Sequence, residues 1–324
     1  MRKYFMEETV YALEQISKLY HFIWPSILAL RNYKNKVDEY VKDNPEVSEN
    51  MLNKLFAEDF EYNGIDFHKA IINKTWEEHL EDFAIVLLTN AFAIYEGWLS
   101  EICEVTEFNG YTNSYGKFIK YEKVFQFPSN GNNGIGRALN ELNNTRCDAM
   151  IDSFYANTVN NKKYSLNKIE NLLICYRFFK ELRNSFIHNG GICDKKLFDS
   201  YNFYQRIANI SLLGVKEVPN VNPVILNEPI TLDIRGVVGL TDVIIRMIIT
   251  IDAEISKSEF GLRYFMKKWI DGCEIGRTMK KDKEKRKIQF HRYIQRLGFP
   301  VTHDIDKLIG YFENSSLQFR PITV

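Results

Sequence analysis

One apolar segment, residues 83–99 (FAIVLLTNAFAIYEGWL), most constrains what this chain can fold into. Wound as a helix it is apolar almost all round, and such a helix needs other helices to cover it in water. The run is shorter than the roughly 20 residues that a membrane span requires. We therefore expect residues 76–106 to form the central, buried helix of an all-α protein.

A second core helix is predicted over residues 166–188. Ser165 stands where an N-cap is expected, and the run Asn189, Gly190, Gly191 favours the left-handed conformation that ends helices. At about 100° per residue, a set of apolar side chains shares one face of this helix. That set is Leu166, Ile169, Leu172, Leu173, Tyr176, Phe179 and Ile187.

Arg183 interrupts this apolar face, at a position level with Leu172 and Tyr176. A guanidinium directed into a core or an interface is costly unless it is paired. His188 follows five residues later, in the last turn of the predicted helix. Either the two side chains form a functional pair, or Arg183 extends over the rim of the bundle and His188 only caps the helix C-terminus.

Glu96 is the one charged residue in the apolar run 83–99. A buried carboxylate either takes up a proton or finds a cation. We expect Glu96 to pair with Arg183 of the other core helix; the alternative is that Glu96 reaches water at a helix end.

The other segments predict further helices and three regions. Residues 5–24 and 26–33 are expected to form two helices, with Pro25 in the first turn of the second. Residues 211–235 contain three prolines between β-branched residues and predict an extended or hairpin insertion, whereas 108–133 suggests a long loop with short strands. The expected regions are 1–74 (N-terminal helices), 75–270 (the helical bundle) and 271–324 (basic C-terminus).

Charge and cysteine usage narrow the class of protein. The 42 Lys and Arg residues balance 42 Asp and Glu residues, so the chain as a whole is no electrostatic binder of nucleic acid or membrane. The cysteines are scattered without C-x-x-C or C-x-x-H pairs, which signals neither a disulfide framework nor a zinc site: Cys103, Cys147, Cys175, Cys193 and Cys273. We expect a cytoplasmic protein that uses no metal or cofactor and does not bind a membrane.

The segment 277–296 is locally basic, with nine Lys or Arg residues against Asp282 and Glu284. Interleaved aromatic residues suit phosphate contacts combined with stacking on exposed bases. The alternative is a solvated helix with ion pairs between successive turns. The candidate RNA-binding residues are Lys280, Lys281, Lys283, Lys285, Arg286, Lys287, Arg292 and Tyr293.

Several common catalytic signatures are missing from the sequence. It has no G-x-x-x-x-G-K-[ST] loop, no G-x-G-x-x-G opening a helix, no H-E-x-x-H and no G-x-S-x-G. Nucleotide-binding, zinc-protease and serine-hydrolase chemistry of these types are therefore not indicated.

Arg183, Asn184 and His188 in RNSFIH, followed by glycine, resemble the signature of the HEPN superfamily: Arg, a polar residue, and His after four to six intervening residues. The segment AFAIYEGWLSEI is similar to the central HEPN helix, in which an acidic residue supports the Arg. The match covers residues 76–270 coarsely. It implies a HEPN-type helical bundle in which Arg183 and His188 are catalytic, Asn184 supports them and Glu96 assists.

The resemblance also implies an activity and partners. These are metal-independent endoribonuclease activity as a homodimer, in bacterial toxin–antitoxin or antiviral defence systems, on RNA such as tRNA or mRNA, with an antitoxin or another defence protein as a partner. The residue types fit attack by a 2′-hydroxyl, which leaves 2′,3′-cyclic phosphate and 5′-hydroxyl ends. The alternative is a HEPN-like module that binds nucleotides, RNA or protein without cleavage.

Overall fold

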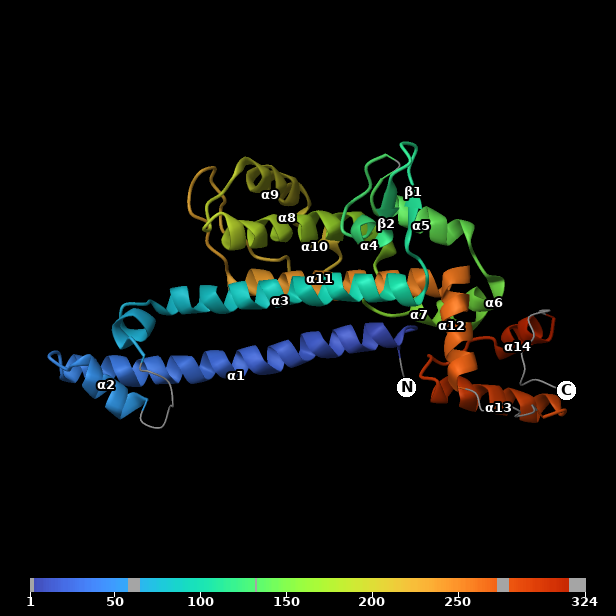
Figure 1. Ribbon diagram of the computed structural model, residues 1–324, viewed down its shortest axis with the longest axis horizontal. Coiled ribbons are helices and arrows are strands. Elements are labelled where there is room, and N and C mark those ends of the chain that lie inside the picture. The colour runs from blue at the N-terminus through green and yellow to red at the C-terminus, as the bar shows by residue number, and fades with distance from the viewer. Residues whose placement is uncertain (1–2, 58–64, 132, 273–279, 315–324) are drawn as a thin grey trace.

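The computed structural model describes residues 3–57, 65–131, 133–272 and 280–314. It is mostly helical and confirms the all-α prediction. Four helices run along the length of an elongated molecule: α1 (Glu7–Asp43), α3 (Trp76–Val105), α8 (Ile169–His188) and α11 (Ile234–Ser256) (Figure 1). Helix α9 (Lys195–Ile207) packs on the outer side of α8.

Shorter elements complete the fold. They are α2 (Glu49–Phe56), the π-helix His68–Ile72, α4 (Tyr121–Val124), α5 (Ile135–Asn144), α6 (Asp148–Met150), the π-helix Ile151–Tyr155, α7 (Ala156–Thr158), the 3-10 turn Leu166–Lys168, α10 (Ile210–Leu213), α12 (Glu259–Gly272), α13 (Lys283–Arg296) and α14 (Ile305–Asn314). Strands β1 (Gly110–Thr112) and β2 (Phe118–Lys120) form one antiparallel hairpin.

Helix α3 is the central helix, as predicted, and packs against α1, α8 and α11. A capping box between Thr75 and Glu78 begins it. By length and composition it is also the one described helix that could cross a membrane, but 44% of its most apolar window is buried inside the fold, and the core helix of a water-soluble protein passes the same test. One strip of α3 stays open to solvent, including Asn90, Ala93 and Gly97.

Helix α8 follows the predicted bounds after the short 3-10 turn. Gly190 and Gly191 have φ of 61° and 75°, and the Gly191 N–H donates to the Ser185 carbonyl at 3.1 Å, which ends the helix. Two expectations about its ends were wrong. The Ser165 hydroxyl donates to the Lys163 carbonyl and does not cap the helix, and Ile187 is 47% exposed.

The N-terminus forms one long helix, not two. Helix α1 passes through Pro25, although proline removes one backbone hydrogen bond and typically costs about 3 kcal/mol in a helix interior. Ile23 and Ile27 are buried on either side of Pro25, and the Ser26 hydroxyl donates to the Phe22 carbonyl at 2.8 Å. Burial of the flanking turns therefore overrides the local signal that predicted a break.

Residues 211–235, expected to be extended or a hairpin, form no hairpin, whereas the short strands expected within residues 108–133 are present. Residues 214–233 form no strand; they run as irregular chain beside the end of α8. The N–H of Ile230 donates to the Gly191 carbonyl at 2.8 Å, and that of Cys193 to the Glu228 carbonyl at 3.0 Å. Prolines lack the N–H that a ladder needs, so only an isolated bridge forms, between Ile192 and Pro229. The hairpin lies instead within residues 108–133.

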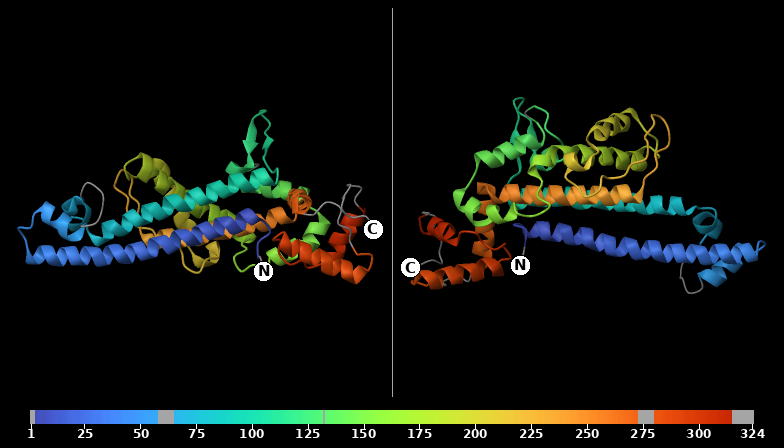
Figure 2. Two further views of the ribbon diagram at one scale, coloured as in Figure 1. Left: turned by 60° about the horizontal axis from the view of Figure 1, so that its bottom comes forward. Right: turned by 180° about the vertical axis from the view of Figure 1, so that it is seen from behind.

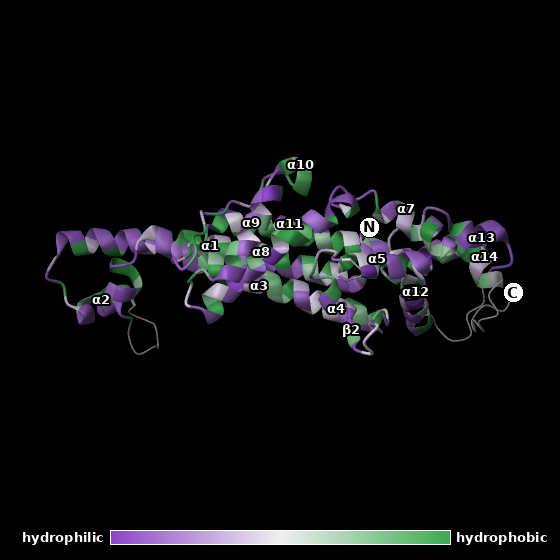
Figure 3. Ribbon diagram, turned by 90° about the horizontal axis from the view of Figure 1, so that it is seen from above, coloured by the Kyte–Doolittle hydropathy of each residue, from purple (hydrophilic) through white to green (hydrophobic). Residues whose placement is uncertain are grey.

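The hydrophobic core does not divide at the expected boundary at residue 270. One cluster extends from Phe5 and Ile16 of the N-terminal segment to Trp269, Phe290 and Phe312. A second, small cluster lies at the other end of the molecule, around Val37, Leu52, Phe67 and Ile71. Figure 3 shows the part of α1 near this end as largely hydrophilic. Region 1–74 is therefore shared between two clusters.

A buried carboxylate fixes the start of α1. Asp252 of α11 accepts hydrogen bonds from the backbone N–H groups of Phe5 and Met6, at 2.8 and 2.9 Å, and from the Thr9 hydroxyl at 2.8 Å. Burial nevertheless raises the pKa of Asp252 from 3.8 to about 6. The ionised form is thus less favourable in the folded chain than in the unfolded chain.

This shift predicts a pH dependence of stability. Between pH 4 and 6 the folded chain holds a proton on Asp252 that the unfolded chain has lost, so this residue's contribution to stability falls as pH rises through that window, by up to about 3 kcal/mol. In Asp252→Asn this contribution is absent. Urea unfolding at several pH values should show the stability difference, wild type minus variant, decreasing from pH 4 to 6.5. Parallel curves would contradict the assignment.

Candidate functional site

Arg183 lies in the second-last turn of α8, on the side of that helix that faces Phe92 of α3. It is half-buried, and its guanidinium carbon lies 5.8 Å from the centre of the Phe92 ring. Its Nε is buried and has no hydrogen-bond partner among the described residues. No carboxylate in the described ranges lies within ion-pair distance of it, although a buried charged donor without a partner costs free energy.

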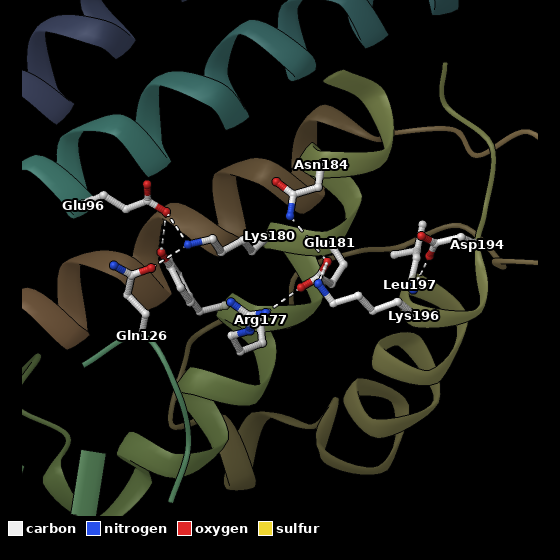
Figure 4. A network of polar contacts seen from close by, with 10 residues as sticks. Glu96, Gln126, Arg177, Lys180, Glu181, Asn184, Asp194, Lys196 and Leu197 are labelled. Atoms are coloured by element: carbon white, nitrogen blue, oxygen red, sulfur yellow. Dashed lines mark hydrogen bonds and ion pairs between the residues drawn. The ribbon is translucent and has the colours of Figure 1, made fainter. Parts of the chain in front are cut away.

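Glu96 pairs with Lys180, so the expected Glu96–Arg183 pair is wrong. Glu96 Oε1 lies 2.7 Å from Lys180 Nζ and accepts a hydrogen bond from the Tyr176 hydroxyl at 3.2 Å. Burial raises the pKa of Tyr176 and keeps that hydroxyl protonated as a donor. The Lys180 ammonium also donates to Gln126, so the Glu96 charge is already neutralised within this network (Figure 4).

Glu96 pairs with Lys180, not with Arg183, because of the register between the antiparallel helices α3 and α8. Glu96 of α3 is level with Lys180 of α8, whereas Phe92, one turn earlier on α3, is level with Arg183, one turn later on α8. The sequence alone gave no register between the two helices. Lys180 could have been found as a competitor, because it stands three residues before Arg183 on the same side of α8.

Asn184 is held by a buried acid that sequence reasoning missed. Its amide lies 3.4 Å from Glu181, whose side chain is 5% exposed. Glu181 also pairs with Arg177 at 2.5 Å and Lys196 at 2.9 Å (Figure 4). The spacing of Arg177, Lys180 and Arg183 puts three cations along one side of α8, and two of them have carboxylate partners.

His188 is exposed in the last turn of α8 and has no hydrogen-bond or ion-pair partner in the described part of the chain. It lies about 7.5 Å beyond Arg183 along the helix axis and about 140° further round. In one chain Arg183 and Asn184 occupy consecutive positions of the helix, about 100° apart around its axis. One chain does not direct Arg183 and His188 at one point.

Exposed apolar side chains occur in the last turn of α8 and in the segments that follow it. Ile187, Ile192 and Ile225 are 47%, 41% and 53% exposed. Hydrogen bonds between residues 191–193 and 227–230 hold the last two beside the end of α8. Exposed apolar side chains gathered in one place mark interaction surfaces more often than isolated ones do.

The basic C-terminal cluster divides into paired and unpaired cations. Lys283 and Lys287 lie 3.9 and 2.8 Å from Asp306, and Arg286 donates to the carbonyls of Lys280 and Lys281. Tyr293 is largely buried. In the described segment 280–296, exposed cations without a carboxylate partner are Lys280, Lys281, Lys285, Arg292 and Arg296. Arg277, which belongs to the predicted basic segment, lies outside the described residues.

The fold also bears on metal binding and on the reactivity of the thiols. The described residues contain no group of three or more His, Cys, Asp or Glu side chains that could hold a metal ion. Four cysteines are buried as free thiols, and burial raises the pKa of each: Cys103, Cys147, Cys175 and Cys193. Cys273 lies outside the described residues.

Comparison with protein families, with curated proteins and with solved structures finds no match to this chain. A function must therefore be inferred from the residues and their arrangement.

The register of α3 and α8 predicts which charges are energetically coupled. A double-mutant cycle with Glu96→Gln and Lys180→Met should give a coupling energy of about 1 kcal/mol, since both side chains are partly exposed. The matched cycle with Glu96→Gln and Arg183→Met should give a coupling near zero. Urea unfolding of the five variants and the wild type measures both, and a larger Glu96–Arg183 coupling would contradict the register.

Proposed function

We propose that this chain is a metal-independent endoribonuclease of the HEPN type that acts as a homodimer. The observation that supports this best is Arg183: a half-buried guanidinium that has no counter-ion among the described residues, followed five residues later by the exposed imidazole of His188. A structural arginine in this position would be expected to have a carboxylate partner, as Lys180 and Arg177 do.

The chemistry needs no metal if the 2′-hydroxyl beside the scissile bond is the nucleophile. His188 takes the 2′-hydroxyl proton or donates one to the 5′-oxygen that leaves. Arg183 binds the non-bridging oxygens and stabilises the extra negative charge that develops on phosphorus. The bond from phosphorus to the 5′-oxygen breaks as the bond from the 2′-oxygen forms, which gives 2′,3′-cyclic phosphate and 5′-hydroxyl products.

A second copy of the chain supplies what one copy lacks. Because Arg183 and His188 of one α8 point in different directions, two copies facing each other across a two-fold axis would direct an arginine and an imidazole at the same phosphate. The exposed apolar residues in the last turn of α8 and in the segments that follow it suit such an interface. Glu181, which holds Asn184, would keep that amide ordered beside Arg183.

The proposal includes a cellular setting. The chain would act in the cytoplasm as a bacterial toxin or antiviral-defence nuclease, on tRNA or mRNA, under the control of an antitoxin or another defence protein.

A second candidate is a HEPN-like module that binds RNA, nucleotides or protein without cutting. The contact of Arg183 with the Phe92 ring favours it, since a cation over an aromatic ring is a stabilising structural interaction. Induced expression separates the two candidates. An active ribonuclease should arrest growth in a manner that His188→Ala abolishes, whereas a binding module should leave growth unchanged.

The direct test is cleavage of labelled tRNA and mRNA by the purified protein with EDTA present, followed by end-group analysis. Arg183→Ala and His188→Ala should each lower the cleavage rate by about 100-fold or more, with the fold retained. Arg206→Ala on α9 and His21→Ala on α1 are matched controls and should cleave like the wild type. Wild-type rates in both α8 variants would remove the proposal.

The dimer can be tested at Ile187. Ile187→Asp places a charge among the exposed apolar residues beside His188, so it should convert a particle of two 38.1 kDa chains into one of a single chain and abolish cleavage. Light scattering after size-exclusion chromatography measures the mass. Leu28→Asp, at a 63% exposed apolar position on α1, is the control and should stay dimeric. A dimeric, active Ile187→Asp would exclude this interface.

A further inference from the structure

A pocket of about 450 Å³ lies on one face of α13, far from Arg183. Lys280, Lys285, Ile288, Gln289, Arg292 and Arg296 line it, together with the largely buried Tyr293. Figures 1 and 2 place α13 and α14 at one end of the molecule, whereas the end of α8 lies beside α9, well away from them in each view.

The cations of α13 that have carboxylate partners and those that have none lie on different faces of the helix. Lys285, Arg292 and Arg296 are seven and four residues apart, which puts them on one side of the helix. They are exposed and have no carboxylate partner in the part of the chain that the structure describes. Lys283 and Lys287, on the opposite side, contact Asp306 of α14. The pocket face thus carries positive charge that the fold leaves unneutralised.

The apolar face of α13 is already used by the core. Phe290 is buried with its ring stacked on Trp269 at 5.0 Å between centroids, and Ile294 is buried beside it. A helix that lies in a membrane surface needs a free apolar face to insert. Among the described residues of the pocket face, Ile288 is the one exposed apolar side chain, so the surface suits a hydrophilic polyanion better than a bilayer.

We propose that this pocket binds the phosphodiester backbone of RNA and anchors the substrate at a distance from the cleavage site. Lys285, Arg292 and Arg296 would contact successive phosphates, and a base would lie against Ile288 and Tyr293. The inference rests on the proposed function and extends it to the class of substrate. The zero net charge of the chain makes such a local patch necessary for RNA binding.

The position of the pocket sets the size of that substrate. Arg183 contacts Phe92, and about 20 Å of α3 separate Phe92 from the end of that helix at Val105. Helices α12 and α13 lie beyond this end (Figure 1). An RNA that reaches both places must therefore extend over more than about 20 Å. This favours RNA the size of tRNA or mRNA over fragments of two or three nucleotides.

The binding test uses the full-length chain with His188→Ala, so that no substrate is cut. Fluorescence anisotropy with labelled tRNA at several salt concentrations should show that Arg292→Glu with Arg296→Glu weakens binding at least tenfold and lowers the salt slope by about two. Lys18→Glu with Lys36→Glu, two exposed cations of α1, makes the same change of charge and should bind normally. Arg292→Gln, a milder variant, should weaken binding less, and circular dichroism checks the fold of each.

The possible results test the pocket inference and the proposed nuclease activity independently of each other. Unchanged RNA affinity in the folded Arg292→Glu, Arg296→Glu variant would overturn the pocket inference, even if His188-dependent cleavage is seen. Tighter binding to vesicles of phosphatidylcholine and phosphatidylserine than to RNA would overturn it also. If the wild type cleaves RNA, Arg292→Glu with Arg296→Glu in a chain that keeps His188 should cut tRNA slowly and a tetranucleotide at the wild-type rate. Lost RNA binding in the variant, together with no cleavage by the wild type, would support the pocket and refute the nuclease.

Discussion

The antiparallel packing of α8 on α3 fixes where the candidate catalytic residues lie. Tyr176 contacts the rings of both Phe92 and Tyr95, with centroids 4.8 and 5.1 Å apart, and is completely buried. A ring of this size held between two others leaves little freedom for one helix to slide along the other. The register that results brings Glu96 to Lys180 and leaves Arg183 over Phe92. The availability of the Arg183 charge is thus a consequence of aromatic packing one to two turns away.

Sequence reasoning reached the elements whose signal is local and repeated. The apolar run of α3 and the face of α8, ended by Gly190 and Gly191, specify two buried helices by themselves. Prediction from the sequence failed where contacts between residues distant in the chain determine the local structure. Burial of Ile23 and Ile27 carries α1 through Pro25, and pairing with residues 191–193 keeps residues 227–230 from forming a hairpin. The partner of Glu96 depends on the axial position of α8 relative to α3, and the residue spacing within each helix does not specify that position.

The placement of charge separates groups that hold the fold from groups left available to a ligand. Asp252, Glu181 and Glu96 are each satisfied by several donors, and each joins elements distant in the chain or successive turns of a helix. The pairs of Lys283 and Lys287 with Asp306 likewise join α13 to α14. Among the described residues, the cations that these pairs leave without a carboxylate partner include Arg183, beside the middle of α3, and those on the pocket face of α13 at one end of the molecule.

Arg183 and the pocket face of α13 are two separate cationic sites on a chain of zero net charge, and their separation affects how RNA would be recognised. In the proposed RNA complex each alone would offer only a few phosphate contacts, and at physiological salt the screening length is about 8 Å, so neither would add to the other through solvent. An RNA that bridges both converts the second contact into an intramolecular one, with a high effective concentration. A homodimer repeats this on both sides of its axis. Affinity would then depend on the shape and length of the RNA more than on its sequence, since phosphate contacts carry no sequence information.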